Sequence, residues 1–180
     1  IVDESHHARS DLSLEMLENF NPCFVLDLTA TPKKESNIIS YVDAVQLKGE
    51  NMVKLPVIVY NRDSQSDVLI DAIDLRNKLE ELACAEYTKT GKYIRPIALF
   101  QAQPKGKEDA TTFEKLRDKL VDAGIPAEQI AIRTADVNEL KNVDLMSPDC
   151  PVRYIITVNA LKEGWDCPFA YILASLANKT

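Results

Sequence analysis

The sequence has few of the residues that form covalent or metal cross-links. Its 180 residues include four cysteines and two histidines, and no two of the cysteines form a Cys-x-x-Cys pair. This spacing argues against a zinc ribbon and against a disulfide framework, so we expect reduced thiols and a cytoplasmic protein. No apolar run approaches the roughly 20 residues needed to cross a bilayer, and no signal-peptide pattern occurs, so no membrane association is expected.

An excess of positive charge is also missing. The chain has 21 Lys and Arg against 28 Asp and Glu, which gives a formal net charge of −7 and a pI near 4.9. A domain that binds nucleic acid through bulk charge is basic, so any nucleic-acid contact here must come from local groups. The hydrophobic fraction of 46% is typical of a globular protein.

A phosphate-binding loop is the third absence. No G-x-x-x-x-G-K-[ST] pattern occurs, and Gly106-Lys107 lies in a charged stretch without the upstream glycine or a preceding strand. The loop that cradles nucleotide phosphates is therefore not encoded in these 180 residues.

The first seven residues carry the most chemistry. Ile1 and Val2 predict a buried strand, and Asp3, Glu4 and His6 follow at its carboxyl end, where open α/β sheets bind ligands. In phosphate chemistry, one such carboxylate holds Mg²⁺ and a second orients the attacking water. A Ser-His-Asp triad is disfavoured because neighbours on a strand alternate faces. The alternative is a pair of solvated acids at a strand end.

Residues 11–20 show helical periodicity, and the apolar run 23–28 predicts a strand that ends at Thr29-Ala-Thr-Pro32. Strand, helix and strand within about thirty residues indicate a βαβ unit with a parallel sheet. Taken alone, the Thr-Ala-Thr-Pro segment is better explained as an ordinary turn that starts a helix. In residues 41–60, apolar and polar residues alternate irregularly, which predicts a hairpin or edge strands. Residues 61–67 are polar and predict a linker between two lobes.

The remainder predicts a second alternating α/β lobe. We expect two helices and four strands, the strands being buried runs rich in β-branched residues. In chain order, the helices are 67–89 and 110–123, and the strands are 95–102, 126–132, 152–158 and 171–176.

Four segments together resemble the motor core of superfamily 2 helicases and translocases. Asp3-Glu-Ser-His6 resembles motif II, the Walker B motif, and Thr29–Pro32 resembles motif III. The strand 95–103 resembles motif IV, and Thr157–Pro168 is similar to motif V. The Lys-Glu-Gly-Trp-Asp-x-Pro form of the last segment looks like the Res subunits of type III restriction enzymes.

The resemblance implies a role for each matching residue. Asp3 would hold the Mg²⁺ of Mg-ATP, Glu4 would orient the attacking water, and His6 would couple hydrolysis to the second lobe. Thr29 and Thr31 would relay nucleotide state. Further candidates lie in the second lobe: Gln101 and Thr157 for contacts to the nucleic-acid backbone, Gly164 for a close turn at the nucleotide, and Asp166 for the ribose or nearby arginines.

The resemblance also implies the organisation. The fold class is α/β, with parallel-sheet RecA-like lobes: an incomplete first lobe at 1–60, a linker at 61–67, and a second lobe at 68–180 that stops before motif VI. The implied function is that of a fragment, inactive alone, of an ATP-dependent DNA translocase and endonuclease subunit, using ATP and Mg²⁺. Its partners would be double-stranded DNA, a methyltransferase modification subunit and a second copy at the open sheet edge of the first lobe. The alternatives are another DEAD/DEAH-type helicase, a type I restriction motor subunit, and a non-catalytic α/β interaction module.

Overall fold

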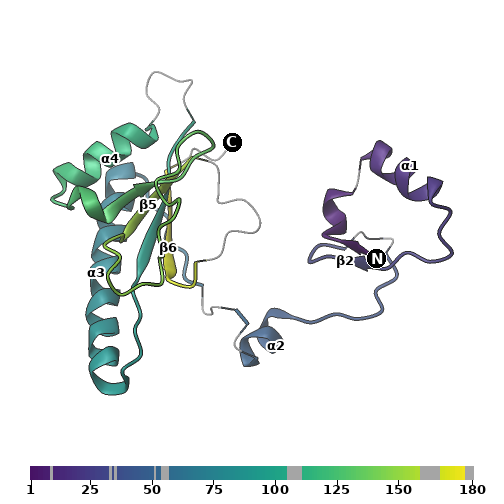
Figure 1. The fold of residues 1–180 in the computed structure, drawn as a ribbon, viewed down its shortest axis with the longest axis horizontal. Helices are drawn as coiled ribbons and strands as arrows, with labels where there is room; N and C mark the ends of the chain where they lie inside the picture. Colours follow the sequence, from purple (N-terminus) through teal and green to yellow (C-terminus); the bar gives the residue numbers. More distant parts are fainter. Residues whose placement is uncertain are drawn as a thin grey trace. The chain divides into compact units, whose positions relative to one another are not determined.

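The structure is a computed structural model that describes residues 1–8, 10–32, 34, 36–50, 52–53, 57–104, 111–158 and 167–176. The chain divides into two compact units, residues 1–59 and residues 60–180 (Figure 1). Both sheets contain only parallel pairs, so the fold is α/β with parallel sheets, as predicted, and is consistent with a RecA-like arrangement. None of the described helices is both long and apolar enough to span a bilayer.

The first unit is a small βαβ arrangement. Val2 pairs with Asp27 and Asp3 with Leu28, and the Val2 N–H donates to the Leu26 carbonyl at 2.8 Å. Not one of the described residues in 1–59 is buried. The elements are β1 (Val2–Asp3), the 3₁₀ helix η1 (Ser5–His7), α1 (Asp11–Asn19), β2 (Asp27–Leu28) and α2 (Ala44–Gly49).

Two predictions for the first unit are wrong in part. The strand expected over 23–28 includes only residues 27–28. It pairs with one strand of two residues, and none of the described residues around it is buried, so little stabilises a longer strand. The hairpin or edge strands expected in 41–60 are not formed by its described residues, and residues 44–49 form α2 instead. There the Asp43 side chain accepts from the Gln46 N–H at 2.8 Å, and the Gln46 side chain accepts from the Asp43 N–H at 3.0 Å. This reciprocal capping box starts a helix and overrides the weak alternation.

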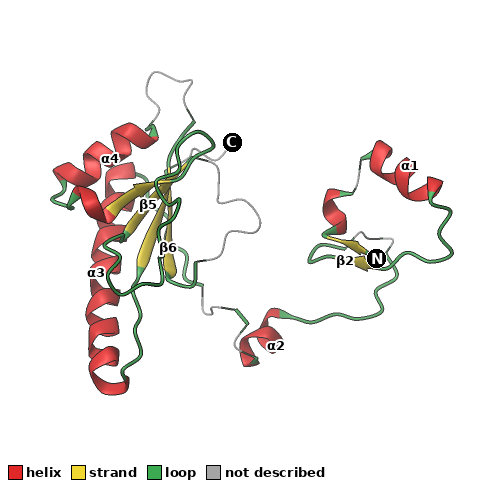
Figure 2. Cartoon of the chain, viewed as in Figure 1, coloured by secondary structure: helices red, strands yellow, loops and turns green. Residues whose placement is uncertain are grey.

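The second unit contains a four-stranded sheet in the order β4-β5-β3-β6. Two α-helices lie beside this sheet, as Figure 2 shows. The Ser64 side chain caps the first helix, which therefore begins inside the stretch predicted as a linker. Gly91, at φ 71°, ends that helix in the left-handed region that glycine adopts without strain. The elements are α3 (Gln65–Thr90), β3 (Ile97–Gln101), α4 (Phe113–Asp122), η2 (Ala127–Gln129), β4 (Ile130–Ile132), β5 (Tyr154–Thr157) and β6 (Ala170–Ser175).

The sheet of the second unit is covered on both faces. Helices α3 and α4 pack on one face, where Phe100 is fully buried and lies in the core. Irregular segments cover the other face around Leu99 and Ile155. Burial on both faces explains why β3 and β5 are continuous apolar runs in the sequence.

Arg95 is the largest fully buried side chain among the residues that the structure describes. Its guanidinium donates to the carbonyls of Cys150 and Leu145, and to that of Ser147 at 3.1 Å. The rings of Tyr93 and Phe169 each lie 5.7 Å from its central carbon. A buried cation of this kind fixes the segment before β5 against the start of β3 and β6.

Candidate functional site

The candidate residues of the first unit meet at the carboxyl ends of its two strands. Because β1 and β2 are parallel and in register, the turn that follows Asp3 lies beside the turn that follows Leu28. The first turn carries Glu4 and His6, and the second carries Thr29. The predicted juxtaposition of these two segments therefore follows from the pairing of only two residues on each strand.

His6 connects the two turns. Its Nδ1 lies 3.1 Å from Glu4 Oε2 and 3.4 Å from Thr29 Oγ1. Thr29 Oγ1 in turn accepts from the Thr31 N–H at 3.2 Å. When Nδ1 carries a proton, its N–H donates to the Glu4 carboxylate. Because the same nitrogen lies beside Thr29 Oγ1, the position of the carboxylate depends on the Thr29 turn. The structure thus brings together four of the predicted residues, with Asp3 directly adjacent in the chain.

Glu4 has an unusual backbone conformation. Its φ of 48° and ψ of 46° place a non-glycine residue in the left-handed region, and its N–H donates to the side chain of Asp3 at 3.0 Å. The chain turns sharply at Glu4, so the direction of its side chain is not set by the alternation of the strand. Left-handed non-glycine residues are uncommon and often mark sites where a side chain must point in a particular direction.

The fit of Mg²⁺ to this region is partial. Asp3 and Glu4 offer the carboxylate oxygens that Mg²⁺ prefers. Within the part of the chain that the structure describes, no group of three or more His, Cys, Asp or Glu side chains could hold a metal ion. The arrangement suits a Mg²⁺ that keeps most of its waters and phosphate ligands and takes a single protein carboxylate, for which Asp3 is the candidate.

In the second unit, two predicted residues lie at the carboxyl edge of the sheet. Gln101 on β3 is in register with Thr157 on β5 and with Ser175 on β6, so the three side chains come from adjacent strand ends. The Ser175 hydroxyl donates to the Gln101 side chain at 3.0 Å. Gln101 is half-buried, whereas Thr157 is only 3% exposed. A phosphate contact from the Thr157 hydroxyl would therefore require its covering to open.

A hydrogen-bonded network at the same edge was not predicted. The Thr111 hydroxyl donates to the Gln65 side chain at 2.7 Å, and the Thr111 N–H donates to the Gln103 side chain at 2.9 Å. Both glutamine amides donate to the Leu176 carbonyl, at 3.3 Å from Gln65 and 3.0 Å from Gln103. The network joins the start of α3 to the ends of β3 and β6. The sequence signal was a second polar residue, Gln103, just after a buried strand; nothing marked Gln65 or Thr111.

The remaining predicted residues, Gly164 and Asp166, lie outside the described residues, as does Trp165 beside them. The structure therefore brings together the predicted residues of the first unit and, separately, Gln101 and Thr157 of the second.

The parallel sheets define the fold class as α/β, and the polar side chains gather at the edge where open sheets of this class bind ligands. Residues 1–34 match the family described as "Type III restriction enzyme, res subunit". This match covers β1, α1 and β2 and supports a Res-type, helicase-like segment there. No curated protein matches the chain. No solved structure matches it either.

Proposed function

We propose that this chain is part of an ATP-dependent DNA translocase of the type III restriction kind. The observation that carries the proposal is the Glu4–His6–Thr29 connection at the ends of two parallel strands, within the segment that is similar to the Res family. In such a motor, Asp3 would hold Mg²⁺ and Glu4 would orient the water that attacks the γ-phosphate. ATP and Mg²⁺ would supply the chemistry, and the phosphate loop would come from another part of the motor.

His6 has a specific part in this proposal. Because it contacts both Glu4 and Thr29, any movement of the Thr29 turn changes the direction of the Glu4 carboxylate. Hydrolysis would thereby become sensitive to the position of the segment that follows β2. A positioning residue of this kind changes the rate of the chemical step more than the affinity for nucleotide.

The second unit would form the other lobe of the motor. Gln101 and Thr157 would contact the DNA backbone, and Gly164 and Asp166 would lie near the nucleotide. Double-stranded DNA, a modification methyltransferase subunit and a second copy at the edge of the β1–β2 sheet would be the partners. Since the chain is acidic overall, these DNA contacts would rest on hydroxyl and amide groups rather than on net charge.

The test is DNA-stimulated ATP hydrolysis by the larger motor protein that the proposal requires. Glu4→Gln should lower the turnover number by about 10²-fold or more and leave nucleotide binding intact, because an amide cannot polarise the water. Glu50→Gln, at an exposed glutamate after α2, is the matched control and should hydrolyse ATP normally. If Glu4→Gln and Glu50→Gln have equal rates, the assignment of Glu4 is wrong.

The competing function is a non-catalytic interaction module with solvated carboxylates. It predicts that nucleotide binding does not depend on Mg²⁺ and that Asp3→Asn has no effect on it. Measuring nucleotide affinity with and without Mg²⁺ in the wild-type and Asp3→Asn proteins therefore separates the two functions.

A further inference from the structure

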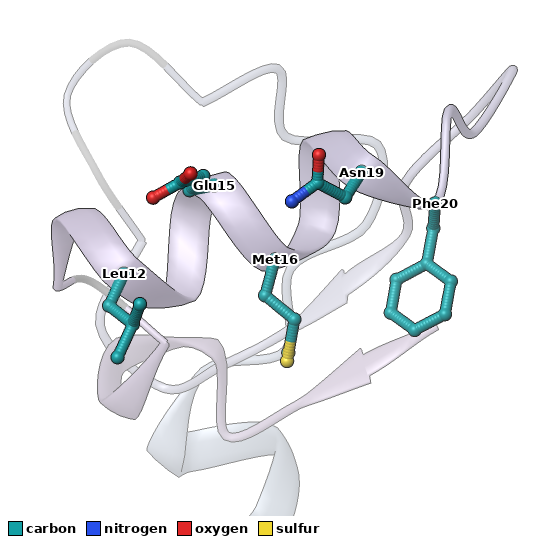
Figure 3. A pocket seen from close by; sticks show the side chains of 5 residues that line it. All are labelled: Leu12, Glu15, Met16, Asn19 and Phe20. Atoms are coloured by element: carbon teal, nitrogen blue, oxygen red, sulfur yellow. The ribbon is translucent and has the colours of Figure 1, made fainter.

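Helix α1 carries an exposed apolar stripe. Leu12, Met16 and Phe20 follow one another at intervals of four residues and are 76%, 54% and 75% exposed. Figure 3 shows that all three side chains extend from the same side of the helix. Together with Glu15 and Asn19, they line an open hollow of about 300 Å³. We call Leu12, Met16 and Phe20 the α1 stripe.

The α1 stripe is separate from the less exposed side of the helix. At 100° per residue, the stripe spans about 80° of the helix circumference. Leu17 and Leu14, the less exposed leucines, lie beyond it at about 140° and 200° from Leu12. Ser13, at about 100°, lies between these leucines and the α1 stripe, so the stripe is a separate apolar face of the helix, and such a face is normally covered by another element.

The charge beside the stripe limits what can cover it. Asp11, Glu15 and Glu18 form a ridge on one flank of the α1 stripe, since they lie at about −60° to −120° from Leu12. The sequence has no Lys or Arg between residues 10 and 32, so the helix itself carries no cation beside this ridge. A second copy packed on the stripe would bring like charges together, and an anionic membrane surface would be repelled.

We propose that the α1 stripe is a docking surface for an amphipathic helix of a partner protein, with Lys or Arg flanking its apolar ridge. The apolar ridge of the partner covers Leu12, Met16 and Phe20, and its cations face the carboxylates of Asp11, Glu15 and Glu18. Methionine at the centre of the stripe allows partners of different shape to pack. This inference is independent of the function proposed for Glu4.

The size of the surface sets the strength of the interaction. A helix of nine residues is about 13 Å long, so the contact falls in the small class below about 1,200 Å². Contacts of this size are weak and transient, and we expect a dissociation constant in the micromolar range. Charge complementarity then contributes mainly to specificity and to the rate of association.

The experiment uses the 180-residue chain and a fluorescent synthetic peptide of about 14 residues, long enough to form a helix when bound. The peptide has leucines at helical spacing and lysines on both flanks, and a matched peptide has glutamate in place of every lysine. We expect the lysine peptide to bind at least about tenfold more tightly than the glutamate peptide, and to weaken between about 50 and about 500 mM salt.

Three variants locate the binding surface. Phe20→Ser should weaken the lysine peptide at least about fivefold, because it removes the largest apolar group of the stripe. Glu15→Lys should weaken the lysine peptide and tighten the glutamate peptide, an exchange of preference that loss of folding cannot produce. Leu173→Ser, at an equally exposed leucine on β6, is the control and should bind like the wild type.

Several results would overturn the proposal. Equal binding of the two peptides would show unspecific apolar association, and absence of binding would show that the stripe docks no such helix. Dimerisation that Phe20→Ser abolishes would make a second copy the occupant. Stronger binding to vesicles of anionic lipid than to the lysine peptide would make it a membrane surface.

Discussion

Replacing Arg95 tests the packing of the second unit most directly. Its side chain is fully buried and donates to three backbone carbonyls between Leu145 and Cys150. Removing it leaves those carbonyls without their donor and leaves a cavity between Tyr93 and Phe169. The segment that leads into β5 then loses its attachment to the start of β3.

The magnitude follows from the number of contacts. Each hydrogen bond from a charged group contributes about 1.5–3 kcal/mol, so three would sum to roughly 4.5–9 kcal/mol. The loss is smaller because burying the cation itself costs free energy, which Arg95→Ala recovers. We therefore expect Arg95→Ala to lower the free energy of unfolding by about 4 kcal/mol, just below the lower end of that sum. Arg95→Lys keeps the charge without the fork of donors and should lose about half as much.

Urea titration followed by helical circular dichroism measures both variants, because α3 belongs to the same unit as Arg95. Arg62→Ala is the matched control: this arginine is 44% exposed and pairs with Asp71 on the surface. It should change the free energy of unfolding by less than about 1 kcal/mol. If Arg95→Ala lowers the free energy of unfolding by less than about 1 kcal/mol, water replaces Arg95 as the donor to the carbonyls and the buried cation contributes little to stability.

Four further outcomes are expected. Burial raises the pKa of Tyr154 above its ordinary value, so the unfolded state loses this proton first. Stability should therefore fall as the pH rises above about 10, and less steeply in Tyr154→Phe, as measured by urea unfolding across that range. Leu116→Ala, in the core, should cost about 2–5 kcal/mol in the same titration, whereas Leu82→Ala, which is 66% exposed, should cost less than about 1 kcal/mol. Amide hydrogen exchange, read by mass spectrometry, should be fast for the described residues in 10–50 and slow in β3 and β5, since the buried residues among those described all lie in the second unit. Finally, because it lacks a phosphate loop, the pure 180-residue chain should not hydrolyse ATP in a phosphate-release assay; DNA-stimulated turnover would contradict this.

The fold of the second unit could be predicted because its strands are buried on both faces. Continuous runs such as 97–101 and 154–157 have few alternatives to a central parallel strand, and the long helix follows from its apolar spacing. The first unit was harder to predict because no described residue of it is buried. There the local capping at Asp43 decided the structure, and the longer apolar patterns did not.

The candidate site shows the same division. Asp3, Glu4, His6 and Thr29 could be predicted, since residues after two consecutive parallel strands must meet at one edge. The left-handed turn at Glu4 could not, because glutamate has no preference for that conformation. The Gln65–Thr111 hydrogen bond joins residues 46 positions apart, and neither residue type predicts a distant partner of this kind.

The strand order of the second unit also determines when it can form during synthesis. Strand β3 lies between β5 and β6, and Gln101 pairs with Ser175, 74 positions later in the chain. Such non-local pairing forms late, because a long loop must close before any contact stabilises it. A ribosome that has released only α3, β3 and α4 has therefore exposed a central apolar strand with neither of its neighbours. Until β6 has emerged, this segment is a natural binding site for chaperones, and slow translation between residues 101 and 170 would lengthen that exposure.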